Sequence, residues 1–287
     1  MTAAAQPGMR GGWPVVPLLL LPIVLINVAG FLLPVLNLLR MSFNEAEATG
    51  AMHEAFTLVT WLKVFQDSFY WELIGNSVMV SLGITLLTLV CSYPIALYLH
   101  RSSGTWRTIL LVLVISPLLT SAVVRTYGWI AILSDNGLIA NGLKAAGMTS
   151  PPRLIFNLTG VFIGVTEILM PYMILALTAG FGRLDPRVEE AAMTLGATPM
   201  RAFFRIVLPL TLPGIALGSL LCFVLAVSSF ITPKLLGGGR VFLLATEVYD
   251  QAIVTLNWPL AATLSIIVLV VFGAALGIYG RVLRGVG

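Results

Sequence analysis

The sequence predicts an all-α, polytopic membrane protein with six transmembrane helices. Hydrophobic residues make up 58% of its 287 residues and charged residues only 10%, and the mean hydropathy is +0.99. About a quarter of the residues of a soluble globular protein are charged, so this composition excludes that class. A bilayer core of about 30 Å needs about 20 apolar residues per helix. Six runs are long enough: residues 11–39, 73–99, 108–134, 154–182, 206–233 and 251–280.

Four of these runs contain no charged residue, and the other two contain one each. Arg125 interrupts the third run and Glu167 interrupts the fourth. Each of these two segments could instead be re-entrant or interfacial, but both are long enough to cross the bilayer, so we expect spans. The first run exceeds the apolar core of about 7–15 residues that is typical of a signal peptide, so we expect it to be retained.

The segments around the first span divide the N-terminal part of the chain. We expect residues 1–12 to be a mobile cytoplasmic N-terminus and residues 13–72 to hold the first span and an outer segment. The outer segment, 40–72, carries aromatic residues that suit either an interfacial helix or a plain connector. These residues are Trp61, Phe65, Tyr70 and Trp71.

The distribution of basic residues predicts the orientation. Basic residues are concentrated in the cytoplasmic segments of membrane proteins. With both termini in the cytoplasm, the inner segments carry Arg10, Arg101, Arg107, Arg183, Arg187, Arg201, Arg205, Arg281 and Arg284. The longer outer segments carry Arg40, Lys63, Lys144, Arg153, Lys234 and Arg240. The density of basic residues is therefore higher inside.

Several classes of site are not indicated by the sequence. No basic residues interleave with aromatic residues on a polar face, so nucleic-acid binding is not expected. His53 and His100 are isolated, which argues against a metal site, and Cys91 and Cys222 fall within predicted spans. No Gly-Lys-Ser/Thr phosphate loop is present, so we expect no ATPase site, no catalytic residue and no cofactor bound by this chain.

One loop between the fourth and fifth runs carries the most informative pattern. Asp185 followed by Pro186 predicts a helix start, because Asp caps free N–H groups and Pro suits the first turn. We expect a short helix over 188–195, and Gly196 then supplies a left-handed residue that ends it. Thr198 and Pro199 repeat the start signal for a second helix. The loop is therefore predicted to form a water-facing helix-turn-helix.

The same loop resembles the EAA loop of permease subunits of binding-protein-dependent ABC importers. Its matching positions are Glu190, Ala191, Ala192, Gly196, Ile206, Leu208 and Pro209. The resemblance implies that residues 73–282 form a type I ABC importer transmembrane domain, with the MetI-like fold. It also implies that residues 183–209 form a coupling loop, which docks into a cleft on a cytoplasmic ATPase. An ordinary amphipathic loop between two spans is the alternative.

Other segments suggest a substrate. Residues 116–129 and 135–139 are similar to the third-span region of spermidine/putrescine permeases, and residues 168–173 resemble their fourth span. The resemblance implies transport of a small organic solute, and it favours a polyamine such as spermidine or putrescine as that solute. Permeases for opines, phosphonates, iron chelates or sulfate share parts of these segments. A secondary transporter is less favoured, because we find no clear internal repeat and only one carboxylate deep in a span.

The resemblance also implies the partners of this chain. They are two ATPase subunits that use the ATP, a second (sister) permease and a periplasmic substrate-binding protein. The expected location is the inner membrane of a bacterium, with the chain embedded in the lipid bilayer.

Polar and aromatic residues on the third and fourth spans are candidates for the translocation path. A charge within a membrane span is expected to face the protein interior and to have a partner. Glu167 could contact a passing cation or form a structural ion pair with Arg125, and Arg125 could also reach the headgroups. The aromatic candidates on the same spans are Tyr127, Trp129 and Tyr172.

Overall fold

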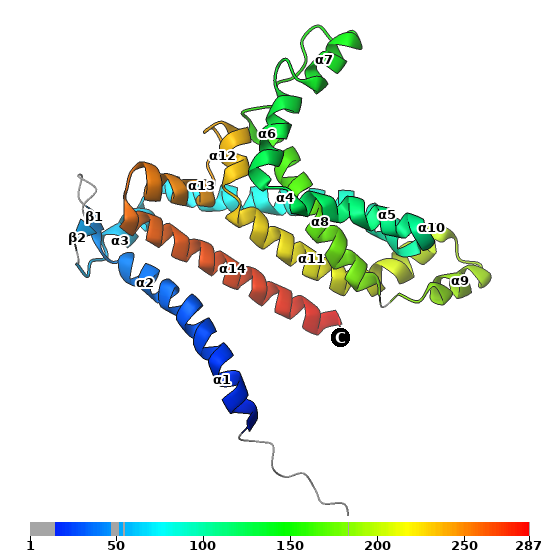
Figure 1. Cartoon of the computed structure of the whole chain (residues 1–287), viewed down its shortest axis with the longest axis horizontal. Coiled ribbons are helices and arrows are strands. Elements are labelled where there is room, and N and C mark those ends of the chain that lie inside the picture. The colour runs from blue at the N-terminus through cyan, green and yellow to red at the C-terminus, as the bar shows by residue number, and fades with distance from the viewer. Residues whose placement is uncertain (1–14, 47–51, 54, 183, 287) are drawn as a thin grey trace, which may run out of the picture.

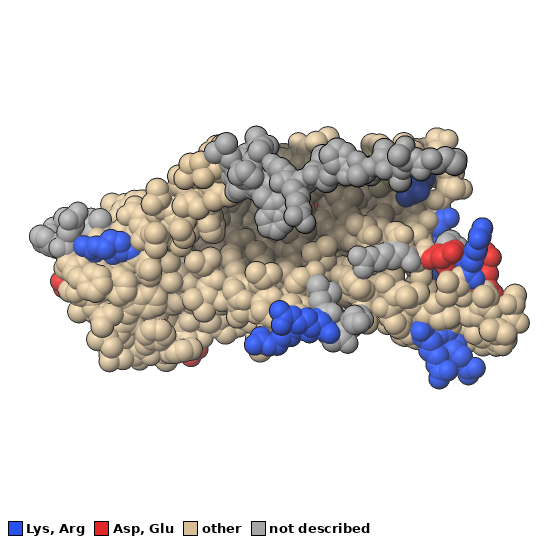
Figure 2. Space-filling view, turned by 90° about the horizontal axis from the view of Figure 1, so that it is seen from below, with Lys and Arg blue, Asp and Glu red and all other residues tan. Residues whose placement is uncertain are grey.

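The computed structural model describes residues 15–46, 52–53, 55–182 and 184–286. The N-terminal segment 1–12, expected to be mobile, lies outside the described residues. Helices form most of the described chain, which confirms the all-α class, and one small antiparallel sheet pairs β1 (Glu45–Ala46) with β2 (Met52–His53). Figure 1 shows long helices gathered in a bundle, from which an arm projects. In Figure 2, uncharged residues cover most of the visible face.

Four long helices form the core of the bundle. They are α4 (Ser68–Arg101), α8 (Leu158–Phe181), α11 (Leu208–Ser228) and α14 (Trp258–Val286). Helices α4, α8 and α11 pack against one another, and α14 packs against α11. Their shared core includes Met173, Leu177 and Cys222, whose side chains are fully buried. Because lipid tails are as apolar as these side chains, close packing holds the helices together rather than exclusion from water.

Helices α8 and α11 approach each other closely where both carry glycine. A Cβ atom placed on Gly180 would lie only 2.6 Å from the Cα atom of Gly214. Farther along the same contact, a Cβ on Gly218 would lie 2.7 Å from the sulfur of Met173. Small residues of this kind let helix backbones approach within a membrane, so these glycines fix the spacing of α8 and α11.

The first span stands at the edge of the bundle. It consists of α1 (Val15–Asn27), a π-helical turn (Val28–Leu32) and α2 (Leu33–Met41). No residue of its apolar window within Leu20–Met41 is buried. Helix α2 contacts α14, whereas Figure 1 shows α1 diverging from the other helices.

The third predicted span, 108–134, is not one straight helix. Helix α5 (Gly104–Ile115) is followed by a 3₁₀ turn (Ser116–Leu119), and α6 (Ala122–Leu133) leads to α7 (Leu138–Ala145). The two halves of this segment meet at 99°. Pro117 lies within the turn and lacks an N–H group, which favours a break there. Helices α6 and α7 form the projecting arm in Figure 1.

The number of spans agrees with the six predicted runs when the bent segment counts as one. Among the described residues, five helices are long and apolar enough to cross a membrane, and the bent pair allows a sixth. Several predicted ends differ from the ends of the helices, two of them where an apolar run extends beyond its helix. Helix α11 stops at Ser228 although the apolar run continues to 233, and α14 begins at Trp258 although its run begins at 251.

Short helices fill the segments between the spans. They are α3 (Val59–Gln66), α12 (Ile231–Gly237), α13 (Leu244–Tyr249) and a π-helical turn (Asp250–Val254). The interfacial role expected for the aromatic residues of 40–72 fits only some of them. Phe65 and Trp71 are about half exposed, whereas Tyr70 is buried against Leu73 and Leu244.

Candidate functional site

The predicted coupling loop forms the expected helix-turn-helix. Helix α9 (Pro186–Thr194) begins after Asp185, whose carboxylate accepts a hydrogen bond from the Arg187 N–H at 3.0 Å. Gly196 follows with φ +88°, a conformation that favours glycine. The Thr198 hydroxyl then accepts from the Arg201 N–H at 3.4 Å and begins α10 (Pro199–Ala202). The local signals in the sequence therefore predicted this loop correctly, with α9 shifted slightly toward the N-terminus.

The seven motif residues divide into two groups. Glu190, Ala191 and Gly196 are exposed on α9 and its turn, and Ala192 is partly exposed. The other three lie where a π-helical turn (Phe203–Val207) passes into α11. Ile206 and Leu208 are half-buried there, and Pro209 is exposed in the first turn of α11. The first group faces outward, and the second joins the loop to a long helix of the bundle.

Large apolar side chains are exposed around the turn of the coupling loop. Leu195 is 88% exposed and Met200 is 68% exposed. Phe204, Val188 and Met193 are also exposed. Several large exposed apolar side chains within one short loop are typical of a contact with another protein or with lipid.

An ion pair that the sequence analysis did not anticipate joins the coupling loop to α4. The Arg101 guanidinium donates from Nη2 to both carboxylate oxygens of Glu189, at 2.7 and 3.0 Å. A cleft of about 290 Å³ lies beside the pair and is also lined by His100, Glu190 and Met193. The two paired residues are 88 positions apart, so no local pattern indicates their contact.

Three of the five candidate path residues come together between α6 and α8. The Arg125 guanidinium donates to Glu167 Oε1 at 3.4 Å, and the Trp129 indole N–H donates to Glu167 Oε2 at 3.3 Å. The side chain of Arg125 is 12% exposed and that of Glu167 is 30% exposed. Tyr127 is exposed, and Tyr172 packs against the main core. The ion pair between Arg125 and Glu167, which was one of the two interpretations of Glu167 from the sequence, is thus present in this structure.

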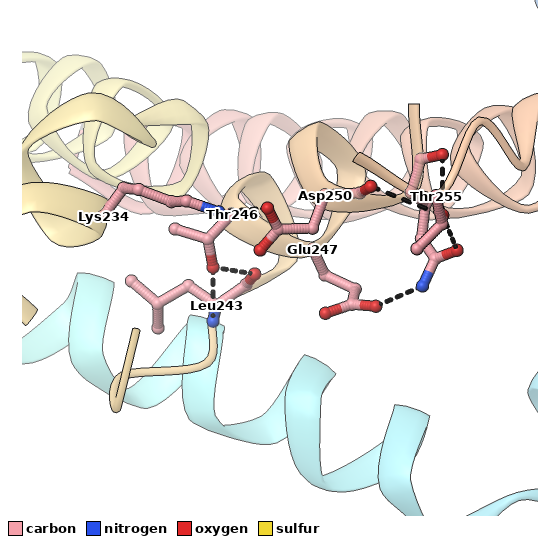
Figure 3. Close-up of polar contacts among 7 residues, drawn as sticks. Lys234, Leu243, Thr246, Glu247, Asp250 and Thr255 are labelled. Atoms are coloured by element: carbon pink, nitrogen blue, oxygen red, sulfur yellow. Dashed lines mark hydrogen bonds and ion pairs between the residues drawn. The ribbon is translucent and has the colours of Figure 1, made fainter. Parts of the chain in front are cut away.

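Further polar contacts of the bundle lie near α12 and α13. The Thr126 and Thr232 hydroxyls lie 2.9 Å apart and connect α6 to α12. Lys234 of α12 pairs with Asp250, and the Gln251 amide donates to Glu247 at 2.7 Å (Figure 3). Lys234 also lies 5.2 Å from the centre of the Tyr249 ring. Apart from the place of Lys234 in an outer segment, the sequence gives no sign of these contacts, because the residues match no motif.

The fold and the loop together define a class: a multi-pass membrane protein that presents a short, exposed helix-turn-helix between two of its spans. The chain belongs to the family of binding-protein-dependent transport system inner membrane components, whose family model matches residues 14–286. It is therefore the permease subunit of an ABC importer, a multi-pass protein of the inner membrane. Importers of this family assemble with a binding protein and an ATPase.

Relatives and solved structures agree with this assignment. The chain is 34% identical to the spermidine/putrescine transport system permease protein PotB of Salmonella typhimurium (strain SL1344), over 91% of this chain and 93% of that protein. It is 33% identical to PotB of Escherichia coli (strain K12), over 91% and 97%. The fold resembles a bacterial ABC transporter involved in the import of the acidic polysaccharide alginate. That likeness has a TM-score of 0.67 at 18% identity and covers 94% of this chain and 96% of that chain.

Proposed function

We propose that this chain is one of two permeases that together form the translocation path for a polyamine such as spermidine or putrescine. Both termini lie in the cytoplasm, a periplasmic protein delivers the substrate, and the sister permease contributes the other half of the path. This chain holds no ATPase site of its own. The observation that carries the substrate class is the 34% identity to PotB over 91% of the chain.

The coupling loop is the proposed contact with the ATPase. Two ATPase subunits bind ATP and move together, and α9 follows the subunit on which it docks. The exposed Glu190, Ala191 and Leu195 give that subunit a small polar and apolar surface to bind. The motion reaches the membrane through Leu208 and Pro209, which begin α11. Such a rigid-body transition switches the path between outward and inward access.

Glu167 is the proposed cation contact along the path. A polyamine loses water when it enters a narrow route, and a carboxylate or an aromatic face replaces that hydration. In this structure the Arg125 guanidinium and the Trp129 indole both donate hydrogen bonds to the carboxylate of Glu167. A carboxylate accepts about four hydrogen bonds, so a substrate ammonium group binds Glu167 either beside these two donors or in place of Arg125.

Uptake by the reconstituted complex tests the function. The permease, its sister, the ATPase and the binding protein are placed in proteoliposomes that contain ATP, and uptake of labelled spermidine is followed. We expect ATP-dependent uptake that unlabelled putrescine reduces. Uptake of sulfate, a phosphonate or an iron chelate without uptake of spermidine would refute the substrate and leave the importer assignment standing. Uptake that needs an ion gradient and no ATP would refute the proposed coupling.

Substitutions at the ion pair test the path role separately. Glu167→Gln leaves Arg125 without its charged partner, and breaking a buried pair costs about 3 kcal/mol. The double variant Arg125→Gln/Glu167→Gln removes both charges, so neither charge is left without its partner. If Glu167 contacts the substrate, the double variant assembles normally but takes up spermidine slowly. Normal spermidine uptake by the double variant would show that the pair is structural only.

A further inference from the structure

The ion pair between Arg101 and Glu189 connects the coupling loop to a span that the motif does not reach. Arg101 is the last residue of α4, and Glu189 lies in the first turn of α9. A basic residue at a helix C-terminus and an acidic residue at a helix N-terminus each interact favourably with the helix dipole. The two side chains therefore suit their own helices as well as each other. The contact closes the gap between two helix ends.

Few other contacts hold α9 in place. None of the described side chains of α9 is buried. The chain is anchored on both sides of this helix, by Leu184 before it and Ala202 after it, which are 6% and 1% exposed. The cleft of about 290 Å³ is lined by residues of α9 and of the end of α4, so the ion pair lies beside a space that apolar packing does not fill.

Helix α4 is well placed to transmit a motion. It packs against both α8 and α11, and near its C-terminal end Ala96 and Leu99 are buried in the main core. A displacement of its last turn therefore moves packed side chains of two other spans. Without the ion pair, a displacement of α9 reaches the bundle through the chain at its two ends, from Leu184 to α8 and through α10 and the π-helical turn to α11.

We propose that Arg101 and Glu189 form a second mechanical link, through which the coupling helix moves α4 together with α11. The inference rests on the proposed function, because it requires that α9 contacts the ATPase. Arg101 and Glu189 act here as positioning residues and touch neither the substrate nor ATP. In the free chain half of the Arg101 side chain is exposed. An ATPase seated on the loop would exclude water from the pair and strengthen it.

The test compares charge variants in the reconstituted complex with its ATPase and binding protein. The variants are Arg101→Glu, Glu189→Arg and the double exchange Arg101→Glu/Glu189→Arg. The control is Arg107→Glu, a change at another exposed arginine, at the beginning of α5. The readouts are the amount of ATPase that co-purifies and the spermidine imported per ATP hydrolysed. An exposed ion pair contributes up to about 1 kcal/mol, which corresponds to about a fivefold change in an equilibrium.

We expect each single variant to lower the spermidine imported per ATP about fivefold, while co-purification of the ATPase stays within twofold of the unaltered complex. The double exchange should recover most of this ratio, and Arg107→Glu should leave it unchanged. An unchanged ratio in both single variants would overturn the link. The link would also be overturned if the single variants lost ATPase binding while the complexes that remain imported the normal amount of spermidine per ATP hydrolysed. If the unaltered complex itself imports no spermidine under ATP, the proposed function fails instead.

Discussion

Gly196 shows how one residue determines the shape of the coupling loop. Its φ of +88° ends α9, and a Cβ placed on it would meet no atom of the described residues within 4 Å. The sequence predicted a left-handed residue here, and the positive φ of Gly196 confirms that prediction. Any close approach at this residue therefore comes from a partner and not from the chain itself.

Gly196→Val should weaken the loop and its contact with the ATPase. A β-branched residue in a left-handed conformation costs about 1–2 kcal/mol, so the turn rearranges or α9 shortens. Gly147→Val is a matched control, because Gly147 has φ +97° and equally open surroundings, in a segment proposed to lie on the other side of the membrane. We expect the ATPase to co-purify with the Gly147 variant but less with the Gly196 variant. Equal retention by both variants would contradict the role of α9.

Contacts between distant residues mark the limit of what the sequence could predict. The caps at Asp185 and Thr198 depend on neighbours two or three positions away, so a local pattern identifies them. The pairing of Arg125 with Glu167 could be stated only as one of two interpretations, since it depends on how α6 and α8 pack. The Arg101–Glu189 pair was missed for the same reason, because it depends on where two separate helices end.

At the scale of elements, apolar run length predicted which segments can cross the membrane but not their course. Within the run 108–134, Pro117 favours a break, but the 99° angle cannot be predicted, because hydropathy reports composition and not the direction of a helix axis. Apolar residues continue beyond Ser228, so the break between α11 and α12 could not be predicted from hydropathy either. The contact of α8 with α11 is different, since it depends on glycines that allow the backbones to meet.

Gly180→Ala should separate α8 from α11. The new methyl group would lie 2.6 Å from the Gly214 Cα atom, so the helix backbones have to move apart, at a cost of about 1–3 kcal/mol. Gly75→Ala provides the comparison, because Gly75 is also helical but has open space around it. Thermal unfolding of the purified complex should show a lower midpoint for Gly180→Ala and an unchanged or higher one for Gly75→Ala. An unchanged midpoint for Gly180→Ala would mean that the two helices do not depend on this contact.

At the scale of the whole molecule, the proposed orientation can be read from labelling. Cysteines at Ser103 and Thr198 should react only from the cytoplasmic side, and cysteines at Asn141 and Arg240 only from outside. All four positions are exposed in the structure, so burial does not limit the reaction. The unaltered chain is the control, because its Cys222 is buried and its Cys91 half-buried within spans. Labelling of the cysteine at position 198 from outside by an impermeant reagent would show that the orientation is the opposite of the one proposed.

Cross-linking to the ATPase tests the central claim most directly, namely that this permease couples to an ATPase through the α9 turn. Leu195 and Leu138 are 88% and 76% exposed, and they are proposed to lie on opposite sides of the membrane. Each is replaced by Cys in turn, and the assembled complex is treated with a short thiol cross-linker that also reacts with amines. A cross-linked product that contains the ATPase is predicted for Leu195→Cys only. The account is contradicted if Leu138→Cys gives that product, or if Leu195→Cys gives none while the ATPase still co-purifies.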